Sequence, residues 1–352
     1  MQPRSSSPPP LKRARRTLTD SPPYPTSSDP HSTNGHASTS ASSSSNTTTS
    51  LPPLSLSILG VEPLDEFIKE IADFIHHMIV TRPYAHEYPA ARVEVEAKIG
   101  LLRDRATGGR VVLPVLVETI LAPGATDTRF ESNMSLHQHK HFNTLLNKLK
   151  MESPSGASPL GYSHLYLIDS FYAFDPSSSS GAGASSSSSS SGGMGMGGGG
   201  ERGERGEKVR VTTDEKTKAV IECVRKVRLG DLNVYSPKRE ADWRVSVNLE
   251  IPVPRPTGTS THTRRKDRIS YSHEEFKIDL TQVTSSMSPN APPQTLHELE
   301  LEIARPDFLL ATALKRGDPA APEHERSAFD ELIRAFVNNA RILVRNSGEG
   351  WQ

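Results

Sequence analysis

The chain has 352 residues, and its 41 Lys and Arg residues balance 41 Asp and Glu residues to give a formal net charge of +0. This balance excludes a protein that coats nucleic acid indiscriminately, so any nucleic-acid contact must be local. The chain has one cysteine, Cys223, which excludes an intrachain disulfide and points to a reducing compartment. No apolar run is long enough for a membrane span or a signal peptide, so we expect no membrane partner.

Two segments have compositions that disfavour folding. Residues 1–59 are rich in Ser, Pro and Thr, so burial cannot offset their ordering entropy and we predict a disordered tail. The basic cluster at 12–16 within this tail is typical of a nuclear-import signal and favours a nuclear location. The alternative is a solvated basic cluster that no import receptor binds. A Ser/Gly-rich stretch at about 176–206 predicts a disordered insertion in one folded domain, 60–352.

Three segments repeat apolar residues at helical spacing, over 64–78, 139–150 and 327–344. Pro63 precedes the first segment, where a first helical turn tolerates proline, and Pro83 ends it. We expect these helices to serve packing only.

Between the helices the sequence period drops to two. Apolar and polar residues alternate over 208–212, 243–251, 264–271 and 276–281. Many strands at short intervals predict an antiparallel sheet or barrel, so the fold class is mainly β with added helices, an α+β protein.

Carboxylates occupy every second position of two further strand-like stretches, 92–98 and 297–303. Alternate residues of a strand share one face, so each stretch gathers its acids on one side. Two unit charges 4 Å apart repel by about 4 kcal/mol at an effective dielectric near 20. Protons, basic side chains or a hard divalent cation must therefore neutralise the cluster.

The polar faces of the predicted strands sort by charge. Acids occupy the first and last strands, while Arg264, Lys266 and Arg268 share one face of another. A solvated face would carry mixed polar residues, so the sorting favours a polar interior. A cation beside a polyanion, such as Mg²⁺ or Mn²⁺ with a triphosphate, fits that interior, and phosphoryl transfer needs mainly positioning and electrostatics.

Five motifs occur in an order that resembles a known family. In chain order they are Glu-Val-Glu-Ala-Lys-Ile-Gly at 94–100, Phe-Glu-Ser-Asn-Met-Ser at 130–135, Arg-Arg-Lys-Asp-Arg-Ile-Ser-Tyr at 264–271, Ile-Asp-Leu-Thr at 278–281 and Glu-Leu-Glu-Leu-Glu at 298–302. The chain resembles, from about 64 to 344, the fungal-type RNA 5′-triphosphatase, which is the beta subunit of the mRNA-capping apparatus and a member of the triphosphate tunnel metalloenzyme superfamily.

The resemblance implies an eight-stranded antiparallel β tunnel with a hydrophilic interior, flanked by packing helices. The enzyme would use Mg²⁺ or Mn²⁺ to remove the γ-phosphate from the 5′-triphosphate end of pre-mRNA. By the resemblance, the metal would be bound by Glu94, Glu96 and Glu302, and the attacking water would be oriented by Glu300. Glu298 would brace the basic side chains, and Lys98 would hold the metal ligands in place. The phosphates would be contacted by Arg264, Lys266 and Arg268, and by the less securely aligned Arg210 and Lys226, with Asp279, Thr281 and Glu250 as supporting residues.

The resemblance also implies a guanylyltransferase, the alpha subunit, as partner, and a homodimer is possible; the sequence shows no convincing Trp-containing docking peptide. One alternative is a tunnel-type tripolyphosphatase or nucleoside triphosphatase. Another is an inactive scaffold that binds RNA ends, which the presence of all three metal-binding glutamates disfavours. A cysteine-phosphatase mechanism is excluded, because Leu229 stands where that signature requires Arg after Cys223.

Overall fold

The computed structural model describes residues 54–83, 87–153, 158–174, 208–286 and 292–348. The chain divides into two units, Met1–Val61 and Glu62–Gln352, and every helix and strand of the described residues belongs to the second. The predicted basic cluster, most of the predicted tail and the predicted insertion lie outside the described residues. Within those residues, no helix has the length and apolar character that a membrane span requires.

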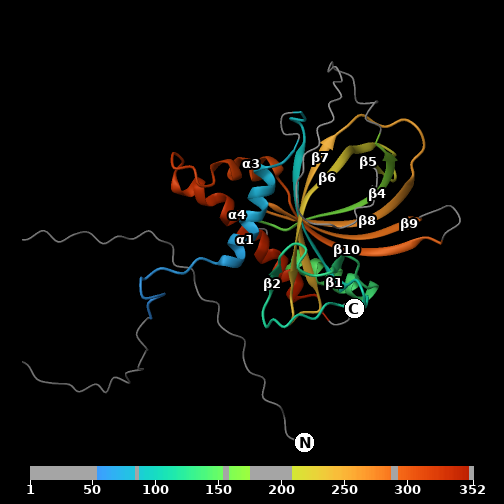
Figure 1. Ribbon diagram of the computed structural model, residues 1–352. Helices are drawn as coiled ribbons and strands as arrows, with labels where there is room; N and C mark the ends of the chain where they lie inside the picture. Colours follow the sequence, from blue (N-terminus) through green and yellow to red (C-terminus); the bar gives the residue numbers. More distant parts are fainter. Residues whose placement is uncertain (1–53, 84–86, 154–157, 175–207, 287–291, 349–352) are drawn as a thin grey trace, which may run out of the picture. The chain divides into compact units, whose positions relative to one another are not determined.

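Eight antiparallel strands close into a barrel (Figure 1). Strand β10 pairs with both β9 and β1, so the path β10-β9-β8-β4-β5-β6-β7-β1 returns to its start. The barrel strands are β1 (Arg92–Asp104), β4 (Gly161–Ala173), β5 (Lys208–Asp214), β6 (Val220–Tyr235), β7 (Asp242–Pro252), β8 (His262–His273), β9 (Phe276–Ser286) and β10 (Gln294–Ile303). The predicted eight-stranded antiparallel tunnel is confirmed.

Two short strands extend the barrel at its edges. Strand β2 (Thr119–Leu121) pairs with β6, and β3 (Thr128–Glu131) pairs with the end of β1. Along β1, Val93, Val95 and Ala97 are buried in the hydrophobic core outside the barrel, while the acidic and basic residues between them face its interior. The alternation of the sequence therefore places apolar side chains outward and charged side chains inward.

Among the described residues, four helices cover part of the outer face of the barrel. Helices α1 (Glu66–Val80), α3 (Pro306–Lys315) and α4 (Glu323–Arg345) pack against one another and between them contact β1, β6, β7 and β10. Helix α2 (Leu136–Glu152) contacts β9 and β10. The packing helices expected from the sequence are present, and α3 is an addition.

Helix boundaries differ from the sequence prediction where side chains cap the helix. Helix α1 begins at Glu66 rather than Leu64, because the Asp65 carboxylate accepts a hydrogen bond from the Ile68 N–H. Helix α2 begins at Leu136 rather than His139, because Ser135 and Gln138 form a reciprocal capping box.

Candidate functional site

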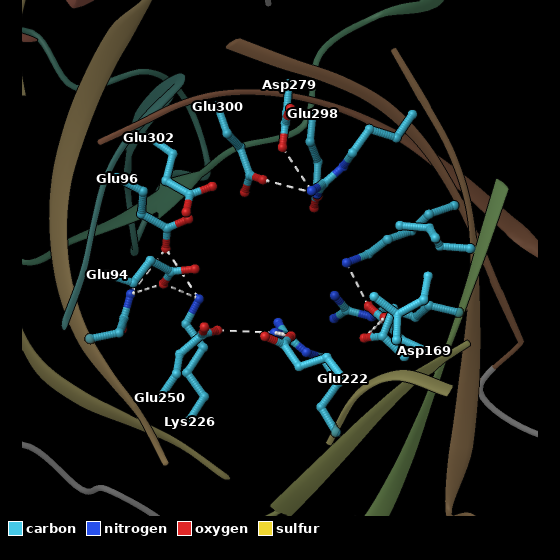
Figure 2. A pocket seen from close by; sticks show the side chains of 18 of the residues that line it. Glu94, Glu96, Asp169, Glu222, Lys226, Glu250, Asp279, Glu298, Glu300 and Glu302 are labelled. Carbon is cyan, nitrogen blue, oxygen red and sulfur yellow. Dashed lines mark hydrogen bonds and ion pairs between the residues drawn. The ribbon is translucent and has the colours of Figure 1, made fainter. Parts of the chain in front are cut away.

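The interior of the barrel is a polar cavity of about 740 Å³. Figure 2 shows its acidic side chains directed toward the open centre. Of 24 lining residues, ten are basic and nine acidic, so the charges nearly cancel. Every residue to which the resemblance assigns a role lines this cavity except Thr281, which is buried in the wall beside it.

The pairing that closes the barrel brings acids of the first and last strands together. In the β1–β10 register Glu96 lies opposite Glu302, and Lys98 lies opposite Glu300. The Lys98 ammonium pairs with Glu300 and lies 3.0 Å from the Glu96 carboxylate. Although burial alone would lower the pKa of Lys98, Glu300 and Glu96 raise it above its ordinary value. Lys98 therefore stays protonated and holds two carboxylates in place.

A second lysine, Lys226, forms ion pairs with the glutamates of β1. Lys226, on β6, pairs with Glu94 and lies 3.6 Å from Glu96. The Asn248 amide donates to both carboxylates, at 2.9 Å to Glu94 and 3.1 Å to Glu96. Against the effect of burial, Lys226, with Lys98, lowers the pKa of Glu94. Both glutamates are thus oriented by donors from β6 and β7.

Glu302 has less compensation for its charge. Burial raises its pKa to about 7, and Glu94 and Asp279 act in the same direction, against Lys277 at 3.2 Å. A carboxyl group with a pKa of about 7 is only partly ionised at neutral pH, and a bound cation would favour its charged form.

The three glutamates suit a hard divalent cation by their chemistry, since carboxylate oxygens are its preferred protein ligands. In the part of the chain that the structure describes, no three such side chains converge as a ready-made metal site. Three lysines, Lys98, Lys226 and Lys277, pair with them instead. The raised pKa of Glu302 indicates that Lys277 only partly offsets burial and the neighbouring acids.

The opposite side of the cavity is basic and is supported by acids in its wall. Lys266 lies 2.5 Å from Asp169, and Arg268 lies 2.7 Å from Asp279. Arg268 Nε also donates to the Thr281 hydroxyl at 3.0 Å. Burial lowers the pKa of Lys266 despite its pairing with Asp169. These bases therefore have fixed directions and little hydration.

Arg210 and Glu298 complete the predicted set. Arg210 lies 2.6 Å from Glu222 and 2.9 Å from Glu250, so its guanidinium is held by acids of β6 and β7. Within the described residues Glu298 makes no ion pair with the bases it was expected to brace. Burial raises the pKa of Glu298, and Glu300 adds to the rise.

Eleven residues that line the cavity had no role assigned from the sequence. Four of them make polar contacts with assigned residues: Asp169, Glu222, Asn248 and Lys277. Three had a signal, because each stands two or four residues before a residue already chosen and so shares its face. Asp169 had none, since its strand reads Leu-Tyr-Leu-Ile-Asp-Ser-Phe at 165–171 and shows no charge alternation.

Comparison with known proteins agrees with this geometry. The sequence model described as "mRNA capping enzyme, beta chain" matches residues 61–349. The mRNA-capping enzyme subunit beta of Schizosaccharomyces pombe is 32% identical over 300 residues, which are 84% of this chain and 86% of that protein. The corresponding subunit of Cryptococcus neoformans is 32% identical over 84% of this chain and 65% of its own length.

Solved structures extend the likeness to the fold. The S. pombe RNA triphosphatase Pct1, determined in complex with the Spt5 CTD, superposes with a TM-score of 0.68 at 32% identity. The match covers 84% of this chain and 99% of that one. A more distant relative, at 24% identity over 74% of this chain and 72% of its own length, is the polynucleotide 5′-triphosphatase CTL1 of Saccharomyces cerevisiae. Sequence and fold thus lead to one conclusion: this chain belongs to the family of mRNA capping enzyme beta chains.

Proposed function

We propose that this chain hydrolyses the γ-phosphate from the 5′-triphosphate end of nascent pre-mRNA and leaves a 5′-diphosphate end. The observation that carries the proposal is the closed barrel whose interior sets acids of β1 and β10 against bases of β8. Such an interior matches the charges of a triphosphate and its counter-cation. Membership of the capping enzyme beta chain family supports the same reaction.

Glu300 is the residue best placed to orient the attacking water. Lys98 and Arg268 lower its pKa against the effect of burial, so it remains a carboxylate at neutral pH. A carboxylate of such low basicity aligns a water by accepting its hydrogen bond and is a poor proton acceptor. We therefore assign Glu300 to positioning the water in line with the γ-phosphorus.

The bases of β8 stabilise the charge of the transferred group. Lys266 and Arg268 are fixed by Asp169, Asp279 and Thr281, so they need little reorganisation when charge develops on the phosphoryl oxygens. Arg264 precedes them on the same face and would meet the diphosphate that leaves. Arg210, held by Glu222 and Glu250, is a further candidate for that contact.

Glu94, Glu96 and Glu302 would hold Mg²⁺ or Mn²⁺. When bound, such an ion supplies Lewis-acid stabilisation of the phosphoryl oxygens. Asn248 and Lys98 keep two of these carboxylates in position, and Lys226 balances their charge.

The direct test is release of labelled γ-phosphate from triphosphate-terminated RNA. Wild type is expected to release it with Mg²⁺ or Mn²⁺, and Glu94→Ala is expected to be inactive. Glu323→Ala is the matched control, because Glu323 is an exposed acid of α4. No release by wild type would refute the proposal, and faster release from inorganic tripolyphosphate than from RNA would favour a tripolyphosphatase.

We further propose a place in nuclear capping for the chain. The family name implies a capping complex, so a guanylyltransferase is the expected partner, since that enzyme consumes a 5′-diphosphate end. Co-purification of the two proteins from nuclear extract would test this partnership.

A further inference from the structure

An aromatic pair stands at the end of the charged path along β8. Phe171 on β4 lines the cavity, and His262 on β8 lies directly opposite it in the strand register. Their rings are stacked, with centroids 4.3 Å apart and planes 2° from parallel. Phosphates need no such surface, so an aromatic ring facing this highly charged interior calls for another explanation.

Thr261 fixes the pair. Its N–H donates to the Phe171 carbonyl at 2.7 Å, and its hydroxyl donates to the same oxygen at 3.0 Å. Because the hydroxyl proton is donated to the Phe171 carbonyl, the hydroxyl oxygen accepts a hydrogen bond from His262 Nδ1 at 3.1 Å. This assigns the ring proton to Nδ1 and leaves Nε2 as an acceptor. Nε2 has no hydrogen-bond partner among the described residues.

Charge around the pair matches a nucleotide. Burial, with Lys208 and Arg264, lowers the pKa of His262, so its ring is neutral at pH 7. The Arg264 guanidinium lies over the Phe171 ring, 5.4 Å from its centroid. Arg264 is thus shared between the aromatic pair and the row of phosphate-contacting bases.

We propose that Phe171 and His262 form a stacking platform for the first nucleobase of the RNA, and that this platform makes the enzyme favour an RNA end over inorganic tripolyphosphate. The inference rests on the proposed function. Successive strand residues rise about 3.4 Å, so His262 lies roughly 14 Å along the strand from Lys266. That span suits a base joined through its ribose to a triphosphate whose γ-phosphate lies beside Lys266 and Arg268.

The test compares Phe171→Leu, which removes the ring, with Phe171→Tyr, which keeps it. For triphosphate-ended RNA, Phe171→Leu is expected to raise KM about tenfold, the effect of losing one base stack, with a small change in kcat. KM for tripolyphosphate should change far less, and Phe171→Tyr should restore the RNA value. Tyr172→Leu is the control, because this neighbour on β4 faces away from the interior.

A binding measurement decides the inference independently of hydrolysis. Diphosphate-ended RNA with 2-aminopurine as its first base is not turned over, and stacking on an aromatic ring quenches its fluorescence. At saturating protein, wild type and Phe171→Tyr should quench it several-fold, and Phe171→Leu should not. Equal quenching by all three proteins, or an unchanged KM ratio in Phe171→Leu, would overturn the platform. Absence of RNA hydrolysis by wild type would instead refute the proposed function, and the quenching would still report on the platform.

Discussion

Glu96 on β1 lies directly opposite Glu302 on β10, across the strand pairing that closes the barrel. The two residues are separated by most of the folded domain in sequence, yet closure makes them neighbours. Lys98 and Lys277 supply nearby positive charge from β1 and β9. The proposed metal site and the closure of the barrel therefore depend on the same pair of strands.

Replacing Lys98 by Met is expected to destabilise the protein by about 3 kcal/mol, because it leaves Glu96 and Glu300 buried without their shared cation. The midpoint of urea unfolding measures the loss. Lys69→Met is the control, since Lys69 forms an exposed pair with Asp73 on α1 and should change the free energy of unfolding by less than about 1 kcal/mol. Equal midpoints for wild type and Lys98→Met would contradict this role.

Divalent metal is expected to stabilise the folded protein. At a concentration about 100 times its dissociation constant, Mg²⁺ or Mn²⁺ should add about 2.7 kcal/mol to the free energy of unfolding and raise Tm, and EDTA should reverse the change. Glu302→Gln should keep the metal-free Tm, because burial already disfavours the charge of Glu302. The same variant should lose the metal-dependent rise; a full rise in Glu302→Gln would exclude Glu302 as a ligand.

Asp169 is expected to matter for activity although it contacts no proposed metal ligand. Asp169→Asn removes the counterion of Lys266, whose pKa burial already lowers, so Lys266 loses more of its charge as pH rises. We expect a fall in kcat of at least about tenfold, steeper at alkaline pH, in line with the loss of one preorganised charge contact. Asp267→Asn is the control, because Asp267 lies on the outer face of β8 against His164. Equal kcat values for Asp169→Asn and wild type would argue against the role of Lys266.

Strict alternation explains why most of the site was predictable. Glu298, Glu300 and Glu302 stand between apolar residues that the helices cover, so both faces of β10 are visible in its sequence. Closure of the barrel then places such faces inside without further information. The fold followed from the same pattern together with the order of the family motifs.

Asp169 and helix α3 were not predicted, because the local sequence around each does not reveal the tertiary contacts that define its role. Strand β4 carries apolar residues toward the cavity as well as away from it, so Asp169 resembles an isolated acid in an apolar strand. Helix α3 is short, and its N-cap residue, Arg305, makes no side-chain capping hydrogen bond. Pro306 and Asp307 in its first turn are typical of a helix start, but a helix of ten residues is marginal alone, so α3 depends on packing against α4 and β1.

Acid is expected to destabilise the protein through a histidine pair outside the tunnel. His139 of α2 packs against His297 of β10 with ring centroids 4.7 Å apart, and Nε2 of each ring is buried without a hydrogen-bond partner among the described residues. Burial, then His297, lowers the pKa of His139 to about 4, while Asp267 acts weakly in the opposite direction. The neutral ring is thus favoured by folding.

The stabilisation from neutral His139 is complete above its unfolded pKa near 6.5 and is lost as pH falls toward 4. His139→Gln does not titrate, so its free energy of unfolding should fall less than that of wild type between pH 7 and pH 4.5, by about 1 kcal/mol after allowance for solvent screening. Urea unfolding at the two pH values measures the difference. His77→Gln, at an exposed position of α1, should follow wild type. Parallel curves for His139→Gln and wild type would show that protonation of His139 does not oppose folding.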